Sequence, residues 1–123
     1  MKQKIVAIVT VFTILAMLVA CSNAEQMDAE AVEATLATKP EMAVSGSPVE
    51  LQASFTGAKV SDKANVTFDI RVDDNPKLVK ADYKGDGVFS GLFDFPKKGG
   101  YTVYIHLYVE DIHLTKKKTV EVK

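Results

Sequence analysis

The chain has 123 residues, with 15 basic and 16 acidic side chains, a formal net charge of −1 and a single cysteine. The absence of a basic excess argues against nucleic acid as a partner, and one cysteine excludes a disulfide within the chain. The length predicts one domain that can bury a sufficient core without crosslinks.

The start of the chain has the pattern of a bacterial lipoprotein signal peptide. Residues 1–4 include two lysines, and the 15 residues from 5 to 19 carry no charge and no proline. Such a run is short for a membrane span of about 20 residues and fits the apolar region of a signal peptide. Leu18-Val19-Ala20-Cys21 matches the lipobox, in which small side chains precede a cysteine whose thiol accepts a diacylglyceryl group. The sequence therefore predicts a leader over residues 1–20 and lipidation at Cys21.

Lipidation would place the mature chain, residues 21–123, on the extracytoplasmic face of a bacterial cell membrane, held by its acyl chains. Loss of Lys2 and Lys4 with the leader leaves 13 basic and 16 acidic residues, a charge of −3. Residues 21–31 are small, polar and acidic after Cys21, which predicts a flexible spacer, with a short helix over residues 25–34 as the alternative. An uncleaved membrane anchor around an incidental cysteine is the alternative to lipidation.

From Val32 onward, apolar and polar residues alternate, which is the pattern of half-buried strands. The alternating segments cover residues 32–36, 49–55, 66–72, 78–83, 88–95, 101–109 and 112–122. Turn residues separate them, most clearly Asp73-Asp74-Asn75-Pro76 and Gly85-Asp86-Gly87. Gly91 shares the phase of its phenylalanine neighbours, which predicts a bulge or the close approach of another strand. Lysines at 116 and 118 interrupt the last apolar phase and predict a break or bulge, or a strand that overhangs the core.

About seven short strands and no convincing helix predict an all-β domain over residues 32–123. The strand number and the turn spacing are typical of an immunoglobulin-like Greek-key β-sandwich. Tyr101 follows Gly99-Gly100 at the start of the penultimate strand, where a tyrosine corner would bond the backbone through its hydroxyl. A tyrosine at the edge of the core is the alternative.

His106 and His113 form the one pair of side chains that suggests specific chemistry. If the last two strands pair across Glu110-Asp111, Tyr108 faces His113 and His106 faces Thr115. The histidines are then diagonal neighbours on the outer face, with Cα atoms roughly 7 to 8 Å apart. Imidazole is a ligand for copper and zinc, so the pair predicts a metal site. Two solvated histidines are the alternative.

Two histidines alone leave a metal site incomplete, and Glu110, Asp111 or Met42 could supply a third ligand. The tyrosines on the same face suit either a partner-binding surface or ordinary β-propensity. The lysines at 116–118 are typical of a protected sheet edge, with contact to anionic lipid as the alternative. The mature chain has no free thiol once Cys21 is lipidated and no recognisable catalytic elbow, which predicts a protein that is not an enzyme.

The order and spacing of four motifs after the lipobox resemble the YtkA-like domain family over about residues 36–123. The motifs are Gly46-Ser47-Pro48-Val49-Glu50-Leu51, Val66-Thr67-Phe68-Asp69-Ile70, Gly85-Asp86-Gly87-Val88-Phe89 and Gly99-Gly100-Tyr101. The resemblance implies an immunoglobulin-like extracytoplasmic domain, often a lipoprotein, related to FixH-type proteins that are linked to cytochrome oxidase assembly. Members often carry two histidines at the spacing of His106 and His113. Some also have a methionine and a further histidine where this chain has Ile112 and Tyr83.

These observations predict a lipid-anchored, non-enzymatic module of the bacterial cell envelope. The first functional hypothesis is an accessory protein that presents or senses a metal, copper, with His106 and His113 as ligands. The alternative is a protein-interaction or structural module without a metal. The expected partners are the membrane, through the lipid on Cys21, and an envelope or oxidase-assembly protein.

Overall fold

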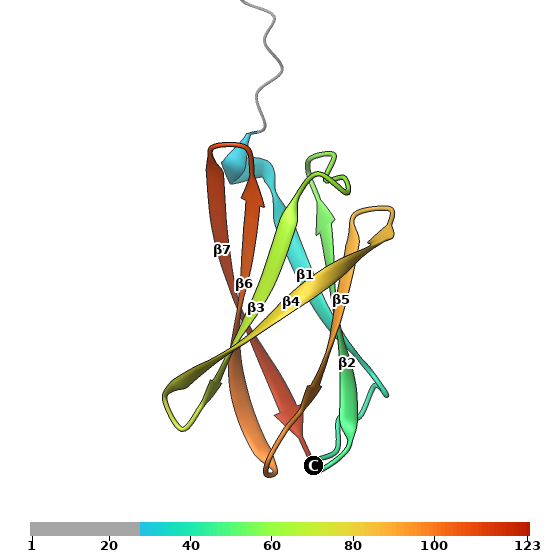
Figure 1. Cartoon of the computed structure of the whole chain (residues 1–123), viewed down its shortest axis with the longest axis vertical. Helices are drawn as coiled ribbons and strands as arrows, with labels where there is room; N and C mark the ends of the chain where they lie inside the picture. Colours follow the sequence, from blue (N-terminus) through green and yellow to red (C-terminus); the bar gives the residue numbers. More distant parts are fainter. Residues whose placement is uncertain (1–27) are drawn as a thin grey trace, which may run out of the picture.

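A computed structural model describes residues 28–123, and the predicted leader and Cys21 lie outside these residues. The described part is all-β, as the alternating pattern predicted, with seven strands and one short 3-10 turn, η1 (Ala29–Ala31) (Figure 1). The strands are β1 (Glu33–Lys39), β2 (Pro48–Thr56), β3 (Asn65–Val72), β4 (Asn75–Gly85), β5 (Val88–Asp94), β6 (Gly99–Val109) and β7 (Ile112–Val122).

The seven strands of the described part form one antiparallel sheet in the order β1-β2-β5-β4-β3-β6-β7. Strand β4 joins the two halves of this sheet, because residues 75–81 pair with β3 and residues 82–85 pair with β5. In Figure 1 it crosses diagonally between β3, β6 and β7 on one side and β1, β2 and β5 on the other. The outer strands almost meet, since Ala43 after β1 forms a parallel bridge with Val122 of β7. The sheet is therefore curled into a nearly closed, barrel-like shape.

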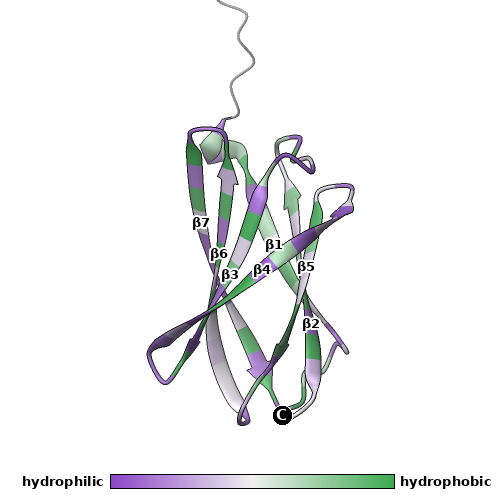
Figure 2. Ribbon diagram, in the orientation of Figure 1, coloured by the Kyte–Doolittle hydropathy of each residue, from purple (hydrophilic) through white to green (hydrophobic). Residues whose placement is uncertain are grey.

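One hydrophobic core fills the space inside the curled sheet. Strand β6 shows most clearly how alternating residues build this core. Its buried residues are Tyr101, Val103, Ile105 and Leu107, and the residues between them are partly or largely exposed. Successive side chains of a strand point to opposite faces, so the alternation in sequence becomes an inner and an outer face. Figure 2 shows this as alternating green and purple bands along the strands. The outer face of β6 consequently carries the residues at 104, 106 and 108.

The two turns predicted at residues 73–76 and 85–87 are present, and residues in both have positive φ angles. Asp73 and Asp74 have φ angles of 49° and 67° and connect β3 to β4 through a two-residue loop. Asp73 also accepts a hydrogen bond from Lys97 Nζ at 2.8 Å, and this bond and the carboxylate charge raise the pKa of Lys97. Short polar side chains tolerate the left-handed region better than most residues, which explains this turn chemistry.

Gly91 of β5 lies where two other strands approach closely, which confirms one of the two alternatives predicted for it. A Cβ atom at this position would lie 2.9 Å from Val79 Cγ1 and 3.6 Å from the ring of Phe68. The missing side chain lets β4 and β3 pack against β5 near the point where the sheet turns over.

A break or bulge near Lys116 and Lys118 was expected, and the structure shows that this was wrong. The β6–β7 ladder runs without a register shift from the pair Val109 and Ile112 to the pair Gly99 and Val122. Lys116 and Lys118 point to the core side and are partly buried, which agrees with the alternative that this part of β7 overhangs the core. The long aliphatic stem of lysine allows this position without a kink.

Tyr101 makes the backbone contact that a tyrosine corner predicts. Its hydroxyl donates to the Lys97 carbonyl oxygen at 2.6 Å and accepts from the Lys97 amide at 3.2 Å. The ring is buried and lies 4.7 Å from the ring of Phe95, measured between centroids. The contact fixes the turn that leads from β5 into β6 and therefore the start of the strand that carries His106.

Candidate functional site

The β6–β7 hairpin brings the two predicted metal ligands into direct contact. The register pairs Tyr108 with His113 and His106 with Thr115, which confirms the predicted pairing across the two-residue turn. His106 Nδ1 lies 3.1 Å from His113 Nε2, and the ring centroids are 5.3 Å apart. The two imidazoles therefore converge through one nitrogen each, on the outer face of the sheet.

Neighbouring side chains on the hairpin restrict the orientation of both rings. The Tyr108 ring stacks on the His113 ring, with 4.2 Å between centroids and 18° between planes. Thr115 Oγ1 lies 3.2 Å from His106 Nδ1, so a hydroxyl also faces the point of convergence. The His106 side chain is 21% exposed and His113 is more open to solvent. The site is a shallow surface pair that solvent or a partner can reach from the His113 side.

Asp69 of β3 lies behind His106 and was not among the predicted site residues. Its Oδ2 atom is 3.6 Å from His106 Nε2 and accepts a hydrogen bond from Arg71 Nη2 at 2.8 Å. The residue is only 6% exposed, and its Oδ1 atom is buried with no hydrogen-bond partner within the described residues. The Arg71 guanidinium in turn lies 5.2 Å from the centroid of the Tyr104 ring. His106 thus has His113 and Thr115 near one ring nitrogen and a buried carboxylate near the other.

The contact between the two histidines fits the spacing of two ligands on one metal ion. At metal–nitrogen bonds of about 2.0–2.1 Å, ligand nitrogens lie about 3.3 Å apart on a tetrahedral ion and about 2.9 Å apart in cis positions of a square-planar ion. The observed 3.1 Å lies between these values. The same 3.1 Å is a hydrogen-bond distance, at which one ring nitrogen donates to the other in the metal-free protein. In the metal prediction, His106 Nδ1 and His113 Nε2 are the two atoms placed to act as ligands.

The structure does not supply the third ligand that was considered for this site. Met42 lies next to Ala43, which bridges Val122 at the far end of β7. Val122 lies nine positions after His113 on the same extended strand, about 30 Å away at about 3.3 Å per position, so Met42 as a ligand was wrong. Among residues 28–123, no group of three or more His, Cys, Asp or Glu side chains is arranged to hold a metal ion, and this includes Glu110 and Asp111.

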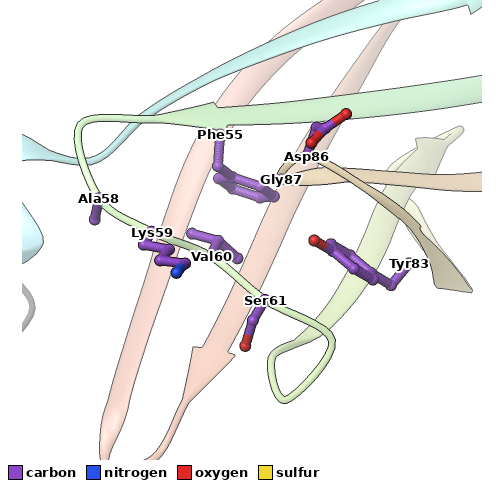
Figure 3. Close-up of a pocket in the computed structure, with 8 residues that line it drawn as sticks. All are labelled: Phe55, Ala58, Lys59, Val60, Ser61, Tyr83, Asp86 and Gly87. Atoms are coloured by element: carbon purple, nitrogen blue, oxygen red, sulfur yellow. The ribbon is translucent and has the colours of Figure 1, made fainter.

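Tyr83 occupies a different region from the histidine pair. It lines a cavity of about 300 Å³ together with Phe55, Lys59 and Asp86 (Figure 3). Its ring packs against Phe89, with 5.0 Å between the ring centroids. Tyr83 is the position at which some members of the resembled family have a further histidine. In this chain, Tyr83 therefore lies at the cavity and against the core, away from the outer face of β6 that carries His106.

No protein-family model matches the chain, and no curated protein matches it either. Within the part of the chain that the structure describes, no helix is long and apolar enough to cross a membrane. The YtkA-like family therefore remains a prediction from the sequence motifs.

Proposed function

We propose that this chain is a lipid-anchored extracytoplasmic lipoprotein whose β-domain presents or senses copper, with His106 and His113 as its metal ligands. The observation that carries the proposal is the 3.1 Å separation of His106 Nδ1 and His113 Nε2 on the outer face of one hairpin. Tyr108 and Thr115 support it, because they restrict the two rings in this arrangement before any ligand arrives. Such preorganisation lowers the entropy loss on binding.

The strand order supports the immunoglobulin-like part of the proposal. An immunoglobulin constant-type sandwich has strands A, B, E and D in one sheet and C, F and G in the other. With β1 to β7 as A to G, this chain has β1, β2, β5 and β4 in one half and β3, β6 and β7 in the other. The hydroxyl contact of Tyr101 lies where the tyrosine corner of this fold is found. These features, with the motif order, favour a YtkA-like domain of this type.

A site with two protein ligands suits an accessory role, since a closed four-ligand site holds its metal for structure. The coordination positions that His106 and His113 leave open would be filled by water or by side chains of a partner. The proposed partner is an envelope or oxidase-assembly protein that receives the ion. In this role the chain only has to position the two histidine nitrogens and leave the bound ion accessible to the partner. His113 is the more exposed of the two histidines, so the partner would approach from its side.

Metal titration of the domain tests this function. Addition of Cu(I), Cu(II) or Zn(II) at micromolar concentration is expected to shift the ring signals of both histidines in NMR spectra with a saturable 1:1 response. His106→Ala and His113→Ala are each expected to lower the affinity at least about tenfold, because each removes one of two ligands. Lys117→Ala, on the outer face of the same strand, is the matched control and should bind as the parent does. No response to any of the three ions, or equal binding by His106→Ala, would contradict the proposal.

The anchor is tested by mass spectrometry of the native protein. The expected mass is that of residues 21–123 plus the lipid on Cys21, and Cys21→Ser is expected to release the protein from the membrane fraction. The matched control is Ser22→Ala, which keeps the thiol. An intact leader with an unmodified cysteine would reject the lipid anchor and the extracytoplasmic location with it.

A metal-free protein-interaction or structural module of the envelope is the second candidate function, favoured by the aromatic character of the same face. Tyr108 is 42% exposed, and Arg71 lies over the Tyr104 ring. Tyrosine and arginine are enriched in protein interfaces relative to the rest of the surface. If the metal titration shows no binding, the exposed aromatic face of β3, β6 and β7 favours the metal-free interaction module.

A further inference from the structure

We propose that Asp69 is a positioning residue that holds His106 in the tautomer with its proton on Nε2. The lone pair on Nδ1 then faces His113 Nε2, which makes Nδ1 the ligand atom. The consequence for metal affinity rests on the proposed function, but the tautomer itself does not, because it is a property of the metal-free protein.

The first support is the state of the Asp69 carboxylate. The residue is 6% exposed, and one of its two oxygens, Oδ1, is buried without a hydrogen-bond partner in the described part of the chain. The other oxygen accepts from Arg71. A buried carboxylate oxygen without a donor is unfavourable, so the carboxylate as a whole is short of donors. The oxygen nearest His106 is Oδ2, and the unpartnered Oδ1 reaches that ring only after the carboxylate rotates.

The second support is the position of His106 relative to this carboxylate. Its Nε2 atom lies 3.6 Å from Asp69 Oδ2, just beyond hydrogen-bond distance, so a small rotation of either side chain brings a donor and an acceptor together. A neutral imidazole has one N–H and one lone pair. The opposite tautomer would direct the lone pair of Nε2 at a carboxylate, which is repulsive. The carboxylate therefore favours the proton on Nε2.

The groups near the other nitrogen are compatible with this choice. Thr115 Oγ1 at 3.2 Å and His113 Nε2 at 3.1 Å can each donate to a lone pair on His106 Nδ1. They can also accept, so they permit either tautomer, whereas a carboxylate can only accept. Among the groups that contact the ring, Asp69 is the one that distinguishes the two forms.

The link to metal binding follows from the same proton. An imidazole that is neutral and bound through Nδ1 keeps its proton on Nε2, so Asp69 favours the ligating tautomer of His106 before the ion arrives, and His113 gives up its Nε2 proton when the ion binds. A carboxylate behind a ligating histidine fixes the ring orientation and raises its basicity, and loss of such a partner lowers metal affinity about 10–100-fold. We expect this range for a variant without the carboxylate.

The tautomer is measured on the full-length chain in detergent micelles with 15N-labelled histidine. The sequence holds two histidines, so the spectrum contains only two rings to assign. Without metal, long-range 1H–15N correlation is expected to show His106 with a protonated Nε2 and an unprotonated Nδ1. Asp69→Leu, which removes the carboxylate, should lower the fraction of His106 in the Nε2–H form toward that of a free imidazole and lower metal affinity about 10–100-fold. Asp94→Leu, an exposed strand acid on β5, is the matched control with the same change of charge.

A second variant separates Asp69 from the groups on the hairpin and keeps the test valid if Asp69→Leu does not fold. His113→Ala with Thr115→Val removes both side chains near Nδ1 at exposed positions. His106 should keep its proton on Nε2 in this variant. A proton on Nδ1 in the parent chain, a switch to Nδ1 in the double variant, or an unchanged tautomer in Asp69→Leu would each overturn the proposal. Absence of metal binding with the Nε2–H form present would reject the metal function and retain the role of Asp69.

Discussion

Phe68→Ala is expected to lower the free energy of unfolding by about 3–5 kcal/mol, the usual loss for a fully buried phenylalanine. Phe68 is 0% exposed and lies in the middle of β3, paired with Val79 of β4 and Ile105 of β6. Both neighbouring strands hold β3 by ladder hydrogen bonds, so the backbone cannot move into the cavity that the missing ring leaves. The loss is a large part of the 5–15 kcal/mol that such a domain has in total.

Urea unfolding followed by far-UV circular dichroism measures this loss, since the chain has no tryptophan for fluorescence. Leu92→Ala on β5 is the matched control, because that leucine is 66% exposed and should change stability by no more than about 0.5 kcal/mol. Equal losses for the two variants would contradict the placement of Phe68 in the core. His106 lies opposite Thr67 in the same ladder, so loss of β3 also removes the support of the histidine site.

The alternation of apolar and polar residues was sufficient to predict the strands, because burial of one face is a local property of each strand. All seven strands of residues 28–123 lie where they were expected, and the ends differ by a few residues. The largest difference is β4, which was predicted over residues 78–83 and extends over Asn75–Gly85. This strand changes its partner from β3 to β5 and has a register shift near Tyr83, so neither face is buried along its whole length and its alternation is weak.

The histidine pair was predictable because a hairpin with a two-residue turn fixes its own register. Once Glu110 and Asp111 form the turn, the positions of His106 and His113 follow by counting along two strands. Asp69 was missed because its contact with His106 depends on the pairing of β3 with β6, which are separated in sequence by two other strands. Asp69 has the outward phase of β3 and an acidic side chain, which predicts exposure, and only the flanking strands bury it.

Gly57→Ala is expected to lower the free energy of unfolding by about 2–5 kcal/mol, from backbone strain and from a steric clash together. Gly57 follows β2 with a φ angle of 85°, in the left-handed region that is unfavourable for alanine. A Cβ atom there would also overlap the backbone carbonyl oxygen of Ala31 in η1. Backbone cannot rotate away as a side chain does, so η1 must shift, together with the buried Val32 that follows it.

Gly46→Ala separates the two contributions. Gly46 has a similar φ angle of 80°, but a Cβ atom there would have no heavy atom within 4 Å. This control should lose only the strain, about 1–2 kcal/mol. The additional loss in Gly57→Ala, measured by the same urea unfolding, then reports how tightly η1 is packed against the end of β2. Equal losses in the two variants would mean that η1 moves aside at little cost, and that the first described residues are not fixed to the domain. A larger loss at Gly57 means that η1 is packed at a defined point beside the β2–β3 loop.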